Sequence, residues 1–128
     1  MNGWFYDRKG KPCVFLYEDR FISRDGHDIG WLVNNRDIYS RTGEHIGWFE
    51  ADVIFDACNR VLAFQQGAIV SLPFVPYTVS MPESPCIPSR PDQPEFHAAP
   101  IKPEYCSGWS HLDAEELFLK EHGHVTAH

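Results

Sequence analysis

Apolar and polar positions follow a pattern that recurs four times in the first half of the chain. Each copy has two apolar residues, then Asp or Ser, two variable residues, and Gly or Asn. The copies occupy residues 5–10, 21–26, 38–43 and 54–59. The steps from Asp7 to Ser23, Ser40 and Asp56 are 16, 17 and 16 residues. A period this short holds one β-hairpin per unit, so residues 4–67 are predicted to form four quasi-equivalent hairpins.

The polar part of each copy predicts the turn of its hairpin. Asp or Ser at the first turn position, with Gly or Asn three residues later, is typical of a type I turn followed by a left-handed residue in a bulge. A positive φ is therefore expected at all four of these turn ends: Gly10, Gly26, Gly43 and Asn59.

The strand after each turn contains three equivalent columns of residues. The first column is Cys13, Ile29, Ile46 and Leu62, the second is Val14, Gly30, Gly47 and Ala63, and the third is Phe15, Trp31, Trp48 and Phe64. Strict alternation would place the first and third columns on one face and the small second column on the other. We expect the small column to crowd a pseudo-fourfold axis. The aromatic column would form the principal packing layer, around that axis or directly behind it.

The second half of the chain has a different composition. Nine of the ten prolines lie in residues 73–103, which excludes central strands there. Such a segment is either a disordered tail or an extended strap. Its apolar content favours a strap over residues 68–108, with an edge strand at 68–72 and with Phe74, Tyr77 and Phe96 partly buried. A helix is expected within 109–123, with Ser110 as its N-cap.

These patterns predict one domain over residues 1–128. Its fold class is all-β with a small α element: four hairpins around a pseudo-fourfold axis, a Pro-rich strap and one C-terminal helix. The chain has a net charge of −7 and no basic stripe, so nucleic acid is not an expected partner. It has no apolar run of membrane length and no apolar leader, which favours a soluble, cytoplasmic protein that does not bind a membrane. The four cysteines match no zinc spacing, and no metal or cofactor is predicted.

Two sequence motifs resemble a known family. The second strands contain Ile29-Gly30-Trp31 and Ile46-Gly47-Trp48, and the C-terminal part contains Trp109-Ser110 followed by Glu115-Glu116. With the Asp/Ser-x-x-Gly turns, these motifs resemble the bacterial 4-fold β-flower proteins. The resemblance implies a repeat-built β domain with quasi-fourfold symmetry, a Pro-rich connection, a C-terminal helix and a soluble bacterial protein. It implies no catalytic residues.

The polar residues give little indication of catalysis. His27 and His45 directly follow turns, where solvent-exposed polar residues are expected. Solubility and helix capping account for the acidic pairs, which are Glu18-Asp19, Glu50 with Asp52, and Glu115-Glu116. No recognised catalytic motif occurs, so no catalytic residue is predicted.

The aromatic column is the one candidate binding site. Phe15, Trp31, Trp48 and Phe64 could line an apolar cavity, fill a solid core, or form an apolar patch for a homo-oligomer. We therefore expect a non-catalytic binding or interaction module for a hydrophobic small molecule or a protein partner. The alternative is a small enzyme whose site is built from loop His and acidic residues.

Overall fold

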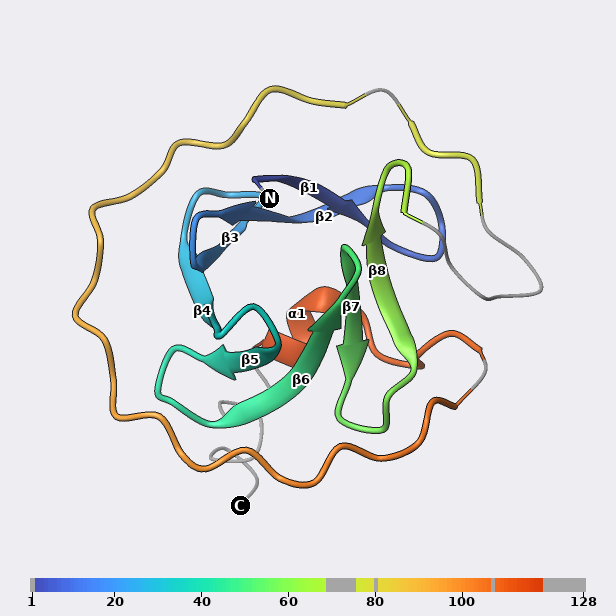
Figure 1. The fold of residues 1–128 in the computed structure, drawn as a ribbon. Helices are drawn as coiled ribbons and strands as arrows, with labels where there is room; N and C mark the ends of the chain where they lie inside the picture. Colours follow the sequence, from blue (N-terminus) through green and yellow to red (C-terminus); the bar gives the residue numbers. More distant parts are fainter. Residues whose placement is uncertain (1, 69–75, 80, 107, 119–128) are drawn as a thin grey trace, which may run out of the picture.

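Eight antiparallel strands close into a barrel in the computed structural model, and each strand pairs with its neighbours in the sequence (Figure 1). The structure describes residues 2–68, 76–79, 81–106 and 108–118. The strands are β1 (Gly3–Tyr6), β2 (Pro12–Tyr17), β3 (Arg20–Ser23), β4 (Asp28–Val33), β5 (Asp37–Ser40), β6 (His45–Glu50), β7 (Val53–Asp56) and β8 (Val61–Gln65). One short helix, α1 (Ala114–Phe118), follows. The predicted fold class, all-β with a small helix, is confirmed.

The four predicted turns are present with the expected backbone geometry. The φ values are 77° at Gly10, 84° at Gly26, 96° at Gly43 and 63° at Asn59. In the first turn the Gly10 N–H donates to the Asp7 carbonyl at 2.9 Å. The Asp7 side chain accepts from the backbone N–H groups of Lys9 and Lys11 at 2.9 and 3.1 Å. An Asp or Ser followed by Gly or Asn thus stabilises each hairpin as the sequence indicates.

Each hairpin also contains a β-bulge, which corrects one expectation. Phe5 pairs with Val14 while Tyr6 pairs with Pro12, so Cys13 is an extra residue in β2. The other three hairpins have the same shift in register. An extra residue interrupts the strict alternation of faces. The column of Cys13, Ile29, Ile46 and Leu62 therefore packs with the inner cluster. The expectation that it shares a face with the aromatic column is wrong.

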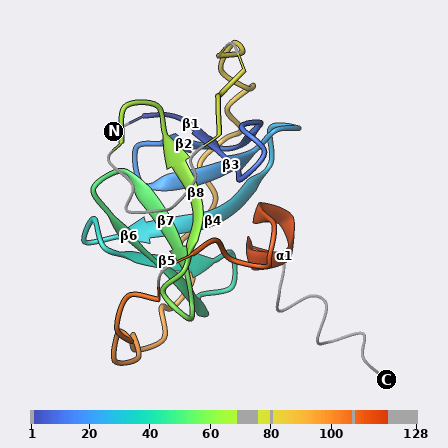
Figure 2. The same ribbon diagram turned by 90° about the vertical axis from the view of Figure 1, so that its right-hand side faces the viewer.

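The inside of the barrel is filled by apolar side chains. At one equivalent position, every hairpin contributes a completely buried residue: Phe5, Phe21, Ile38 and Ile54. At one end, α1 places Leu117 and Phe118 over this core (Figure 2). A Cβ added to Gly30 would lie 2.8 Å from the Phe118 ring, so the small column faces inward and leaves room for the helix.

The cap of α1 differs from the expected one. Asp113 accepts the Glu116 N–H at 2.9 Å, and the Glu116 carboxylate accepts the Asp113 N–H at 3.0 Å. This reciprocal pair is a capping box. Ser110 is not the N-cap, because the helix begins at Ala114 and Asp113 caps it. The Ser110 hydroxyl instead donates to Asp56 at 2.5 Å and ties the segment before the helix to the fourth turn. The predicted extension of the helix to 123 lies outside the described residues.

The described part of the Pro-rich strap, residues 76–79 and 81–106, runs around the outside of the barrel (Figure 1). All nine prolines of residues 73–103 fall on one series of every third position, which is the period of a polyproline II helix. Strap carbonyls spaced nine residues apart meet successive turns: Tyr77 at Gly10, Cys86 at Gly26 and Glu95 at Gly43. The strap therefore carries its own repeat, matched to the hairpins.

Some positions of this three-residue series hold a residue other than proline, and these residues bind the turns. Val79, His97 and Cys106 belong to the same three-residue series, and their N–H groups donate to the carbonyls of the turn-end residues. The distances are 3.0 Å to Gly10, 2.9 Å to Gly43 and 3.3 Å to Asn59. Proline has no N–H, so it is absent where the strap must donate.

Ion pairs add further attachment points between the strap and the hairpin-to-hairpin loops. Arg90 pairs with Asp19 at 2.8 Å, and Lys102 pairs with Glu50 at 2.9 Å. Arg90 holds the pKa of Asp19 below its usual value. Two of the acidic residues expected to serve solubility thus anchor the strap.

The burial of the strap side chains agrees only in part with the prediction. Phe96 is half-buried and contacts Tyr39, with ring centroids 4.8 Å apart, as predicted. The Tyr77 side chain is fully exposed, so that prediction is wrong; its carbonyl, not its ring, meets the barrel. Phe74 and the edge strand expected at 68–72 fall largely in residues 69–75, outside the described part of the chain.

Candidate functional site

The four aromatic candidates lie on the outer face of the barrel wall, on the side that points away from the barrel axis. Phe15, Trp31, Trp48 and Phe64 are 2–8% exposed. Their nearest ring partners differ, and they are Trp4 for Phe15, Phe96 for Trp31, His45 for Trp48 and Trp109 for Phe64. The structure therefore does not bring the four rings together around one cavity. Their role in ligand binding stays a prediction.

A buried pair of polar side chains lies beside one of these rings. His45 Nε2 is 3.0 Å from Asp37 Oδ1, and the two side chains are 4% and 6% exposed. The His45 ring packs between Tyr39 and Trp48, with centroids 5.1 and 4.3 Å away. The surface role expected for His45 is therefore wrong. His27 is exposed, as predicted.

The equivalent position in the second hairpin holds a different pair. Arg20 lies 3.2 Å from Asp28, and Arg20 also donates to the Pro88 carbonyl of the strap. Burial raises the pKa of Asp28, although Arg20 opposes that effect. In the second hairpin the pair at this repeat position thus contributes to the attachment of the strap.

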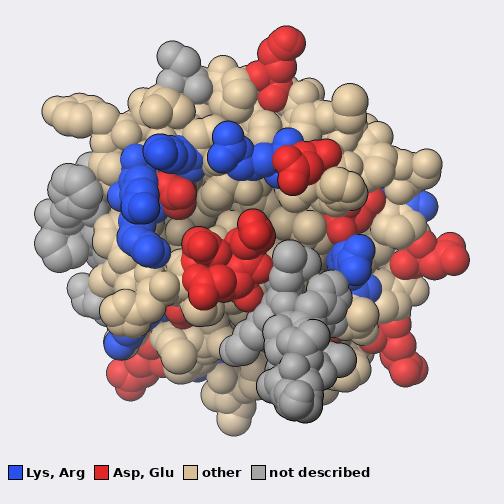
Figure 3. Space-filling model, turned by 180° about the vertical axis from the view of Figure 1, so that it is seen from behind, with Lys and Arg blue, Asp and Glu red and all other residues tan. Residues whose placement is uncertain are grey.

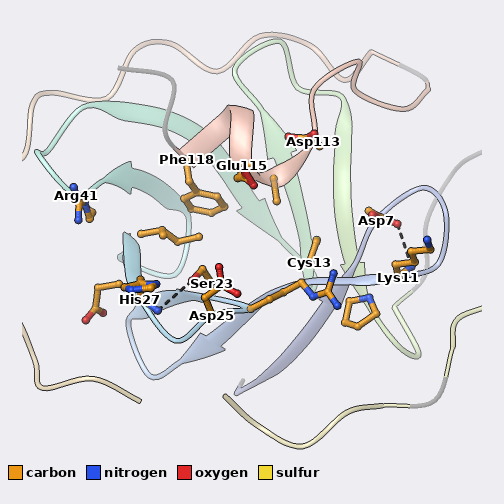
Figure 4. Close-up of a pocket in the computed structure, with 15 residues that line it drawn as sticks. Asp7, Lys11, Cys13, Ser23, Asp25, His27, Arg41, Asp113, Glu115 and Phe118 are labelled. Carbon is orange, nitrogen blue, oxygen red and sulfur yellow. Dashed lines mark hydrogen bonds between the residues drawn. The ribbon is translucent and has the colours of Figure 1, made fainter. Parts of the chain in front are cut away.

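A hollow of about 790 Å³ opens at the end of the barrel where α1 lies (Figure 4). Its walls are the turns of the first three hairpins and the first turn of α1. Its apolar lining consists of Pro12, Cys13, Ile29, Ala114 and Phe118. Burial raises the pKa of the Cys13 thiol far above its ordinary value, so this side chain is a neutral, apolar part of the lining. The volume lies within the usual range for small-molecule sites.

Charged side chains of both signs surround this hollow. Lys11, Arg24 and Arg41 line it from the hairpin turns. Acidic side chains line it too, and they are Asp7, Asp25, Asp28, Asp113 and Glu115. On this face of the molecule, Lys and Arg form an arc beside a central acidic patch (Figure 3). The hollow therefore combines an apolar part of its lining with basic and acidic side chains around it.

Three of the five acidic groups already have partners. Asp7 caps its own turn, Asp28 pairs with Arg20, and Asp113 caps α1. The side chains of Asp25 and Glu115 make no hydrogen bond or ion pair with the rest of the described chain, and neither do those of Lys11, Arg24 and Arg41. These five charged side chains are available to a ligand.

Comparison with known families identifies the chain. The model of the 4-fold beta flower protein family matches residues 3–118. The chain belongs to the 4-fold beta flower family. No curated protein and no solved structure matched the chain. The resemblance drawn from the Ile-Gly-Trp strands and the Trp-Ser ending is thus confirmed for most of the chain.

In this 4-fold beta flower chain the hollow was not anticipated from the sequence, although one signal for it exists. The residue after each turn Asp or Ser is Arg8, Arg24, Arg41 and Ala57 in the four repeats. Three arginines at the same position of successive repeats place three cations at one end of the barrel.

Among the described residues, no three His, Cys, Asp or Glu side chains are grouped as a metal site requires. In the described part of the chain, α1 is far too short to cross a bilayer.

Proposed function

We propose that this protein is a non-catalytic binding module and that its ligand occupies the hollow beside α1. The observation that carries the proposal is the contrast between the barrel axis and the hollow. The barrel axis is filled by completely buried side chains, whereas the hollow is open, has an apolar part in its lining and is rimmed by charged side chains, several of them unpaired among the described residues. Concave sites with an apolar surface and a few convergent polar groups are the usual geometry for small ligands.

The proposal keeps the expected apolar ligand and changes its location. The inner bulge residues Cys13 and Ile29 and the helix residue Phe118 supply apolar surface to the hollow. Because a bulge turns one extra side chain of each hairpin inward, two of these residues reach the end of the barrel. The aromatic column, in contrast, is covered by strap and neighbouring side chains.

The alternative of a small enzyme has one supporting feature. His27 lines the hollow together with Asp25 and Glu115, so a loop histidine and acidic groups do share one site. A general base needs a hydrogen-bonded neighbour that orients it and a nucleophile within reach. The His27 ring has no hydrogen-bond partner among the described residues, since only its backbone is bonded: its N–H donates to Ser23 Oγ and its carbonyl accepts the Ser23 N–H. We therefore favour binding over catalysis.

Binding of the uncharged apolar dye Nile red to matched tryptophan variants tests this proposal. His27→Trp places a bulky ring in the hollow. Glu44→Trp places the same ring at the equivalent exposed position of the third hairpin, which does not line it. The wild type and Glu44→Trp should enhance the dye fluorescence with equal affinity, and His27→Trp should bind about tenfold more weakly. Equal binding by the two variants would place the site elsewhere, and no enhancement with any of them would refute a binding hollow.

A further inference from the structure

The three arginines at equivalent positions of the turns make different contacts. Arg8 Nη1 donates to the carbonyls of Ser110 and Leu112, both at 3.2 Å, and so fixes the segment that leads into α1. Arg24 and Arg41 occupy the same position in their own turns, and both line the hollow. One member of the series holds the helix in place, while two remain available on the rim.

The available cations and anions come from different elements. Arg24 and Arg41 belong to the second and third turns, and Glu115 belongs to the first turn of α1. In Figure 4, Arg41 lies on one side of the hollow while Glu115 projects from the helix that covers it. A purely anionic ligand would meet the carboxylate of Glu115, and a purely cationic ligand would meet the two guanidinium groups. Like charges at short range are unfavourable in such a partly enclosed site.

From this arrangement we propose that the hollow binds a small zwitterion with an apolar body. The chemistry is that of a free apolar amino acid or a short apolar peptide. The ligand carboxylate accepts hydrogen bonds from Arg24 and Arg41, whose planar donors match a carboxylate. The ligand ammonium group lies against Glu115 and Asp25, and its apolar body covers Ile29 and Phe118. This inference rests on the proposed function and specifies the ligand class.

The volume of the hollow supports a ligand of this size. About 790 Å³ exceeds what one amino acid fills and accommodates a peptide of a few residues. The exposed positions of Arg24, Arg41 and Glu115 make their substitution compatible with folding. Charge recognition can therefore be tested without disturbing the barrel.

Four compounds with the same phenyl body separate the two charges. They are L-phenylalanine, phenylpropionate, phenylethylamine and phenylethanol, and their dissociation constants are measurable by NMR titration of the full chain. L-Phenylalanine should bind about tenfold more tightly than either singly charged compound, and phenylethanol should bind most weakly. The tripeptide alanyl-phenylalanyl-alanine, with free or blocked ends, distinguishes the two sources. Tighter binding of the free tripeptide favours a peptide, and tighter binding of the amino acid favours a metabolite.

Variants assign each charge to its partner. Arg24→Gln combined with Arg41→Gln should remove the advantage of L-phenylalanine over phenylethylamine. Glu115→Gln should remove its advantage over phenylpropionate. Lys9→Gln is the matched control, because Lys9 is an exposed cation of the first turn that does not line the hollow. It should leave all four affinities unchanged.

Each failure has its own meaning. If phenylpropionate binds as tightly as L-phenylalanine, or if the four affinities are equal, the zwitterion proposal is overturned while the binding hollow remains. The same holds if Lys9→Gln weakens binding as much as the arginine variants. If none of the four compounds binds and the dye does not bind either, the proposed function itself fails.

Discussion

Replacing Gly43 by Ala tests how strongly the strap is bound to the turns. Gly43 has φ 96°, and an added Cβ would lie 2.1 Å from the Glu95 carbonyl oxygen of the strap. Gly67 is the matched control, because it has φ 88° and an added Cβ there meets no atom of the described residues within 4 Å. Both variants bear the cost of a left-handed alanine, about 1–2 kcal/mol. Only Gly43→Ala also displaces the strap.

The additional cost at Gly43 follows from the contacts near Glu95. The His97 N–H donates to the Gly43 carbonyl at 2.9 Å, and the Tyr39 hydroxyl donates to the His97 carbonyl at 2.7 Å. Each such hydrogen bond contributes about 0.5–1.5 kcal/mol. The Phe96 ring also contacts Tyr39 and Trp31, and each aromatic pair adds about 0.5–1.5 kcal/mol beyond burial. A partial loss of these contacts amounts to about 2–4 kcal/mol.

Urea denaturation followed by tryptophan fluorescence measures the difference. Gly43→Ala should lower the free energy of unfolding by about 2–4 kcal/mol more than Gly67→Ala does. Equal losses in the two variants would mean that the strap contributes nothing at this turn. They would refute the argument that the strap carbonyls require glycine there.

Three further predictions concern the strap and the aromatic column. Val79→Pro removes the N–H that donates to Gly10 and should cost about 0.5–1.5 kcal/mol in urea denaturation, whereas Pro91→Ala, which removes no donor, should cost less. Because Arg90 lowers the pKa of Asp19, this pair stabilises the fold above about pH 3.9, and its contribution is lost as the pH falls through the lowered pKa. The melting temperatures at pH 7 and pH 3 should therefore differ less for Asp19→Asn than for the wild type. Trp48→Ala should cost about 3–5 kcal/mol yet leave dye affinity unchanged, and a matching loss of dye binding would return the ligand site to the aromatic column.

The hairpins were predictable because their signals are local. An Asp or Ser followed three residues later by Gly or Asn determines the turn through the cap and the positive φ, and both occur within six residues. The sequence placed the small column and the aromatic column on opposite faces of the strands, but it placed the column of Cys13 on the wrong face. Cys13 is a bulge residue, and strict alternation makes no allowance for an extra residue. His45 is buried because Tyr39 and Trp48 of the same hairpin enclose it, and the register that pairs His45 with Tyr39 depends on the bulge.

The strap was predicted but its match to the turns was not, and the hollow was not predicted at all. The three-residue series of prolines is visible in the sequence, but its meaning depends on the turns that it meets in space. Gly10 and Tyr77 are far apart in the chain and in contact in the fold. The hollow depends on α1 closing the barrel beside the arginine-bearing turns, and only the in-phase recurrence of Arg8, Arg24 and Arg41 indicated that this end differs.

The most direct test of the proposed function is an amide and indole NMR titration of the full chain with L-phenylalanine. If the ligand binds in the hollow, chemical-shift changes should be concentrated in the turns that contain Arg24 and Arg41 and at Ala114 in α1. The indole signals of Trp31 and Trp48, on the outer wall, should stay in place. Changes centred on those two indoles, with the turn amides unmoved, would contradict the account and favour the aromatic column as the binding site.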